Sequence, residues 1–117
     1  MAINAREILN EFVSGIAPVS EMDGAFIDKF MALDGAAGAL ALDDKTRELI
    51  CVGLAIDKRC KYCICVHVNN AYKAGATRQE ILSAAEVAIA FGGGPSVAYT
   101  ATVLMAAVNE FEHDYDK

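Results

Sequence analysis

The stretch Cys60-Lys61-Tyr62-Cys63-Ile64-Cys65-Val66-His67 holds three of the four cysteines and one of the two histidines of this chain. On an α-helix, Cys60 and Cys63 would lie about 60° apart around the axis and about 5 Å apart along it. His67 would follow Cys63 by about one turn. The stretch therefore predicts a helix that carries two thiols and an imidazole on one face.

This arrangement suits thiol redox chemistry. Only the thiolate is a good nucleophile, and a free cysteine is mostly protonated at neutral pH. A helix N-terminus and the nearby cations of Lys58, Arg59 and Lys61 stabilise a thiolate, and a histidine can accept the proton. The second cysteine can then turn a sulfenic acid or a mixed disulfide into an intramolecular disulfide.

The preceding segment, residues 43–56, is expected to form an antiparallel partner helix. Two aspartates at its start suit the positive end of a helix dipole, and its apolar residues extend nearly all round. If the two helices reverse about the polar break at residues 57–59, Glu48 lies level with His67. A carboxylate there can orient the imidazole or raise its basicity.

The rest of the chain indicates further helices, because apolar residues recur at helical spacing and no useful alternation for a strand occurs. We expect a single all-α domain, residues 1–117, with about six helices. Residues 36–42 are expected to be a short helical turn or a buried connection. The other expected helices are 4–17, ended by Pro18; 20–35, capped by Ser20; 60–74, ended by Gly75; 78–91, opened by a Thr77–Glu80 capping box; and 95–110, started by Pro95.

Composition excludes several classes of protein. The formal charge of −6 argues against nucleic acid, whose phosphates need a basic patch, and against a basic membrane-binding face. Hydrophobic residues make up 55% of the chain, more than a small monomer easily buries, so self-association is expected.

Targeting signals are also missing from the sequence. Polar residues interrupt the N-terminal segment, so it does not read as a signal peptide, and no apolar run approaches the roughly 20 residues of a membrane span. We therefore expect a cytoplasmic protein. In a reducing cytosol, clustered cysteines are more often catalytic or metal-binding than structural.

Zinc is the competing interpretation, since Cys60, Cys63, Cys65 and His67 are all acceptable ligands. On a helix, however, Cys65 points about 200° away from Cys63, so it is expected to be a buried core thiol. Cys51 is also expected to be a core thiol. It nevertheless lies level with Cys63 in the helix pair, so it could act as a third thiol that traps a mixed disulfide.

Glu48, followed by Cys60-x-x-Cys63-x-x-x-His67, resembles the site of the alkylhydroperoxidase D-like proteins of the carboxymuconolactone decarboxylase superfamily. The similarity extends over roughly residues 26–107. The agreeing flanks are Gly38-Ala39-Leu40, Lys45-Thr46-Arg47-Glu48-Leu49, Gly75-Ala76-Thr77 and Glu80-Ile81.

This resemblance implies an all-helical homo-oligomer, typically a trimer or hexamer, whose redox-active members reduce hydroperoxides or disulfides. By the same resemblance, Cys63 is the peroxide-attacking thiol, Cys60 the resolving thiol and proton donor, and His67 with Glu48 the proton relay. The helix dipole alone would instead favour Cys60 as the nucleophile. The founding peroxidases are longer, and Tyr62 stands where they often have a histidine.

We therefore expect a thiol peroxidase with peroxiredoxin-type, antioxidant activity, without cofactor or metal, that an external dithiol or reductase returns to its reduced form. Three alternatives stay open: a reductase of protein or small-molecule disulfides, a carboxymuconolactone-type decarboxylase, and a non-enzymatic redox-sensing oligomer. The paired thiols argue against decarboxylation, which does not need them.

Overall fold

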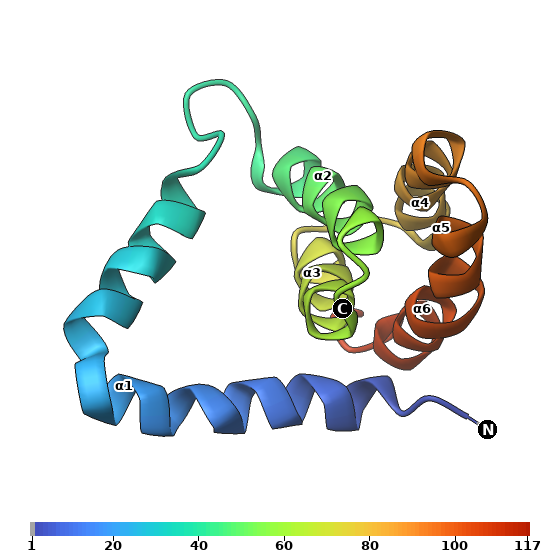
Figure 1. The fold of residues 1–117 in the computed structure, drawn as a ribbon. Helices are drawn as coiled ribbons and strands as arrows, with labels where there is room; N and C mark the ends of the chain where they lie inside the picture. Colours follow the sequence, from blue (N-terminus) through green and yellow to red (C-terminus); the bar gives the residue numbers. More distant parts are fainter. Residues whose placement is uncertain (1) are drawn as a thin grey trace.

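The structure, a computed structural model, describes residues 2–117, and the regular secondary structure within them is helical (Figure 1). The all-α prediction is confirmed. The segments are α1 (Ala5–Ala36), α2 (Asp44–Asp57), α3 (Lys61–Lys73), α4 (Arg78–Gly92), α5 (Gly94–Tyr99), the π-helical segment η1 (Thr100–Leu104) and α6 (Met105–Phe111). No helix within the described part of the chain is both long and apolar enough to cross a membrane.

The core lies where α3 packs between α2, α6 and the first half of α1, with α4 against the other side of α2. Burying one large aliphatic or aromatic side chain stabilises a fold by about 1.5–3 kcal/mol. This core therefore fixes the position of α3 firmly. The largest fully buried side chains are Phe111, Ile56, Ile64, Ile81, Leu104, Val52, Val68, Val108 and Cys65.

Local sequence signals set the helix ends as expected. The Asp43 carboxylate accepts a hydrogen bond from the Thr46 N–H at 2.7 Å and so caps α2. Thr77 and Glu80 form the predicted capping box at the start of α4. Gly75 follows α3 with a φ of 95°, a left-handed conformation that glycine adopts without strain.

The prediction that Pro18 ends the first helix is wrong. Pro18 lies inside α1, and the break comes at Asp23, whose φ of −153° and ψ of 71° are not helical. A proline removes one backbone hydrogen bond, which a helix can tolerate with a bend. The helix restarts at Asp23 rather than Ser20 because the Asp23 carboxylate accepts from the Phe26 N–H.

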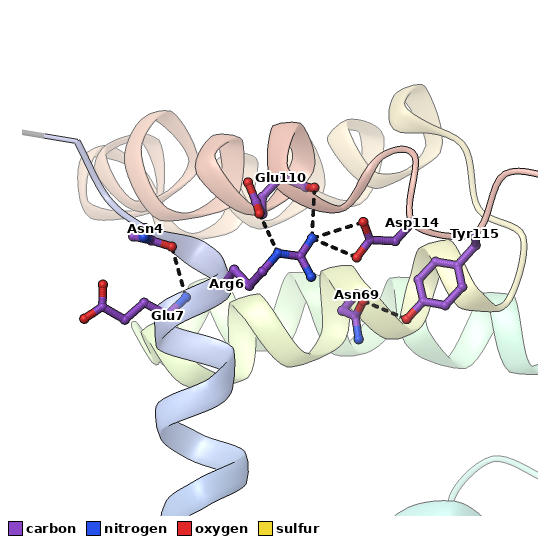
Figure 2. Close-up of polar contacts among 7 residues, drawn as sticks. All are labelled: Asn4, Arg6, Glu7, Asn69, Glu110, Asp114 and Tyr115. Carbon is purple, nitrogen blue, oxygen red and sulfur yellow. Dashed lines mark hydrogen bonds and ion pairs between the residues drawn. The ribbon is translucent and has the colours of Figure 1, made fainter.

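The first half of α1 is tied to the body. Asn4 caps it, and the Arg6 guanidinium lies between Glu110 and Asp114, with contacts of 2.6 and 2.9 Å (Figure 2). Ala5 is buried at this contact. These ion pairs are partly exposed, so the packing of the apolar residues supplies most of the stability.

The second half of α1 and the turn after it, residues 24–42, form a projecting arm (Figure 1). Residues 36–42 form an exposed turn, and Leu40 is completely accessible, so the alternative of a buried connection is wrong. Large apolar side chains remain exposed all along the arm: Phe26, Phe30, Met31, Leu33, Leu40 and Leu42.

The last predicted helix is interrupted by a π-helical segment. Backbone continues helical from α5 through η1 into α6, but residues 100–104 are wound with the wider π geometry. Apolar spacing alone did not predict this change. It matters because η1 lies beside the start of α3, where the paired cysteines are.

Candidate functional site

A tight reversal joins α2 to α3. Arg59 adopts a left-handed conformation with a φ of 55°, which is uncommon for a residue other than glycine. The Cys60 N–H donates to the Ala55 carbonyl at 3.1 Å, so the chain turns back at once. The reversal sets the two helices antiparallel and brings the start of α3 to the end of α2.

Glu48 and His67 meet across this helix pair. His67 Nδ1 lies 3.2 Å from both carboxylate oxygens of Glu48. Glu48 is buried, with 5% of its surface exposed, and His67 is half-buried. The structure thus brings into direct contact the two residues that were predicted to lie at the same level of the helix pair.

The surroundings of Glu48 keep it ionised. Burial of its carboxyl raises the pKa, but the hydrogen bond and charge of His67, the Asn70 side chain and the nearby Arg47 together outweigh burial. The net result is a pKa below the ordinary value for Glu48. A buried carboxylate that is charged at neutral pH can hold a proton donor at Nδ1 and so orient the imidazole.

Cys60 and Cys63 form a disulfide, with their Cα atoms 5.2 Å apart. Cys60 is not within α3 but caps it, since its sulfur accepts a hydrogen bond from the Cys63 N–H at 3.1 Å. Both sulfurs therefore lie at the positive end of the α3 dipole, which favours a thiolate once the bond is reduced. His67 follows one turn further along the same helix.

Cys65 does not belong to this group. It is fully buried in the core, and burial raises the pKa of its thiol to about 11. The zinc interpretation built on Cys60, Cys63, Cys65 and His67 is therefore not supported, because two of its three sulfurs are joined and the third lies in the core.

Cys51 lies closer to the site than its apolar neighbours suggest. Its sulfur, one carboxylate oxygen of Glu48 and one ring nitrogen of His67 all lie within 4.8 Å of one another. Burial, and then the negative charges of Glu48 and Asp34, raise the pKa of the Cys51 thiol. The spacing of Glu48 and Cys51, three residues apart on α2, is the sequence signal that indicates this proximity.

An open groove of about 520 Å³ borders Cys60. Cys63 does not line it, so Cys60 is the cysteine that faces the open space. The sequence did not predict the part of the groove formed by the end of α5 and by η1, because π-helical winding leaves no signal in the spacing of apolar residues. That part consists of Tyr99, Thr102 and Val103, whereas Arg59, Lys61 and Tyr62 flank the cysteine.

Tyr62, which occupies the place of the histidine often found between the cysteines, has a structural contact. Its hydroxyl donates to the Glu11 carboxylate at 2.6 Å and so links α3 to α1. That hydrogen bond to the charged Glu11 raises the pKa of Tyr62. Tyr62 therefore joins two helices.

Comparisons with known proteins identify the family to which this fold belongs. Residues 24–106 match the Carboxymuconolactone decarboxylase family. A crystal structure of an apo carboxymuconolactone decarboxylase family protein from Legionella pneumophila is similar, with a TM-score of 0.84 and 35% identity over 92% of this chain and 96% of that one.

Two sequence relatives carry no described activity. "Uncharacterized protein 4 in cox locus" of Paracoccus denitrificans is 32% identical over 85% of this chain and 89% of its own length. An uncharacterized protein of Cupriavidus necator is 34% identical over 55% of this chain and 57% of its own. The match over residues 24–106 and the shared fold establish that this chain belongs to the carboxymuconolactone decarboxylase family.

Proposed function

We propose that the protein is a thiol-dependent oxidoreductase that reduces hydroperoxides through the Cys60–Cys63 pair. The observation that carries this proposal is the bonded pair at the start of α3, one turn from a histidine that a buried carboxylate orients. A nucleophile, a base and a group that orients the base are the parts that activate a thiol. Membership of the family supports the same activity.

In the first step, the Cys63 thiolate attacks the outer oxygen of the hydroperoxide. The O–O bond breaks, the sulfur is oxidised to sulfenic acid, and the alkoxide leaves as an alcohol after taking a proton from protonated His67. Glu48 stabilises the imidazolium that holds this proton before the transfer. Cys63 is given this role by the family resemblance.

In the second step, the Cys60 thiolate attacks the Cys63 sulfur and displaces hydroxide, which leaves as water after protonation. The disulfide formed is the one in the structure. One thiol of an external dithiol then attacks the disulfide and forms a mixed disulfide with one cysteine. The second thiol of the same molecule attacks the mixed disulfide, so the dithiol leaves as its own disulfide and both cysteines are reduced. Because Cys60 borders the open groove, attack on its sulfur would release the Cys63 thiolate for the next cycle.

Reduction of disulfides is the second candidate activity. The groove of about 520 Å³ beside Cys60 is large enough for more than a small peroxide, and Tyr62 and Tyr99 offer aromatic surface for a thiol compound or a peptide. The same two cysteines would carry this exchange, with Cys60 as the entry point.

We also propose that the protein acts in the cytoplasm as a homo-oligomer, a trimer or a hexamer. The apolar arm supports self-association, and so does an apolar groove of about 520 Å³ between α2 and α4 that Leu54, Val87 and Phe91 help to line. Sedimentation at micromolar concentration tests this proposal. A species with the mass of one chain, 12.4 kDa, would contradict it.

The enzymatic proposal is tested by following an organic hydroperoxide in the presence of excess dithiothreitol. We expect repeated turnover by the wild type. Without the dithiol, Cys60→Ser should consume one equivalent of hydroperoxide and retain a sulfenic acid on Cys63, which dimedone labelling and mass spectrometry detect. Stoichiometric thiol loss without turnover, with any dithiol or reductase tried, would instead indicate a redox sensor.

A further inference from the structure

The side of α2 that carries Glu48 also carries Cys51, and both reach toward His67 on α3. Each of the three residues places one possible ligand atom within 4.8 Å of the other two. The redox cycle uses only Glu48 and His67. Cys51 is thus a half-buried thiol beside the relay with no part in the chemistry above.

The distances are close to those of a bound ion. Around a tetrahedral zinc with bonds of about 2.0–2.3 Å, neighbouring ligand atoms lie about 3.3–3.8 Å apart. The Glu48 oxygens and His67 Nδ1 are already separated by 3.2 Å. The Cys51 sulfur needs to move by no more than about 1–1.5 Å to complete a three-ligand set, which a small side-chain adjustment provides.

Glu48 is the anchor of this group of ligand atoms. Glu48 is buried, and a hydrogen bond from the Asn70 side chain holds its carboxylate in place. A pocket of about 330 Å³ reaches Glu48 from solvent, and Asp44, Arg47, Asn70 and Lys73 also line it. A carboxylate, a thiolate and an imidazole are together a ligand set that zinc accepts.

We propose that Glu48, Cys51 and His67 form a binding site for a divalent cation of the zinc type, and that the bound ion inhibits the thiol cycle. Binding replaces the protons on Cys51 and His67 Nδ1, and these protons go to solvent. With a metal on Nδ1, the imidazole keeps its proton on Nε2 and can accept no second one, so His67 cannot act as a base, and the negative charge of Glu48 is neutralised. The inhibition rests on the proposed function, whereas the binding does not.

Cobalt(II) is the probe for binding, because thiolate ligation gives it a sulfur-to-metal charge-transfer band. Protein with the Cys60–Cys63 disulfide closed is titrated, so that neither of these cysteines can be a ligand. We expect one equivalent to bind with this band, more tightly as pH rises, since Cys51 must lose a proton.

Cys51→Ala should abolish the band and weaken cobalt binding about 100-fold or more, and Glu48→Gln should also weaken it. Cys65→Ala, the matched control, should bind like the wild type. The site is overturned if no band develops at millimolar cobalt, or if the band survives in Cys51→Ala.

The inhibition is measured as the ratio of turnover without and with zinc, added as the chloride, using a monothiol reductant that does not chelate zinc strongly. We expect a ratio of about ten or more in the wild type and close to one in Cys51→Ala. Equal ratios would overturn the inhibition while the cobalt band still reports on the site. Absence of turnover in metal-free protein would overturn the proposed function alone.

Discussion

Cys60 and Cys63 lie at the start of α3, half-buried and bonded to each other, whereas Cys65 lies two residues further on in the centre of the core. The same residue type has opposite properties at the two places. The start of the helix supplies a positive dipole and an open groove, while the core supplies neither and raises the thiol pKa to about 11. Position relative to the helix end, rather than the number of cysteines, therefore decides which thiols can react.

Removing either cysteine of the pair gives the largest expected effect. Cys63→Ser should lower hydroperoxide turnover by about three orders of magnitude or more, because a serine hydroxyl does not ionise at neutral pH. Steady-state assays with dithiothreitol measure the change. Cys65→Ala is the control and should stay within about twofold of the wild type. A large loss in Cys65→Ala with an intact fold would break the distinction between the two places.

Glu48→Gln sharpens the comparison by keeping both thiols and weakening the base. We expect turnover to fall by about 10- to 100-fold, with a shifted pH profile, because the charge that stabilises protonated His67 is lost. Glu86→Gln, which changes an exposed acid on α4, should have no effect. An unchanged pH profile in Glu48→Gln would mean that the carboxylate has only a structural role.

The depressed pKa of Glu48 also gives stability a pH dependence. A carboxyl whose folded pKa lies below its unfolded value contributes stability that is present above the unfolded value, near 4.5, and is lost as pH falls through the folded pKa. Urea unfolding of the wild type and Glu48→Gln between pH 7 and about pH 3 measures this. The difference in the free energy of unfolding between the wild type and Glu48→Gln should become smaller as pH falls. A difference that stays constant would contradict the lowered pKa of Glu48.

The core position of Cys65 predicts a cost in stability rather than activity. Cys65→Ser should destabilise the fold by about 1–3 kcal/mol, because a hydroxyl without a partner would be buried among apolar side chains. Cys65→Ala should cost less. Chemical denaturation measures the free energy of unfolding of both variants. Equal stability of Cys65→Ser and the wild type would show that water or a polar group reaches this position.

The smallest expected effect is a difference in alkylation rate between the two free thiols, Cys51 and Cys65. In the disulfide form, only Cys51 and Cys65 are free. At pH 8.5, iodoacetamide should modify Cys51 slowly, since its pKa is raised, and Cys65 only after unfolding. Intact mass should therefore show one adduct in native protein and two in denaturant. Rapid double modification of the native protein would contradict the burial of Cys65.

The features predicted from sequence are those that local chemistry determines. The Thr77 cap and Gly75 determine helix ends through residues close to them in sequence. The reversal after Asp57 places Glu48 at the same level as His67 in the helix pair. These depend on neighbours along the chain or on one helix pair.

The features that sequence did not predict depend on more distant packing. The kink at Asp23 is a competition between two capping positions, and the π-helical winding at residues 100–104 adds no residue that apolar spacing can detect. The arm is exposed because its apolar residues meet nothing within one chain. The three-residue spacing of Glu48 and Cys51 places both on one side of α2, but the approach of Cys51 to His67 also depends on side-chain packing across two helices.

The central claim is that Cys60 and Cys63 are the working thiols of a redox cycle. The most direct measurement is to mix fully reduced protein with an organic hydroperoxide, count the free thiols and map the new bond by mass spectrometry. We predict that two of the four thiols disappear and that the bond joins Cys60 to Cys63. Four thiols remaining, or undiminished peroxide consumption by Cys63→Ser, would contradict the claim.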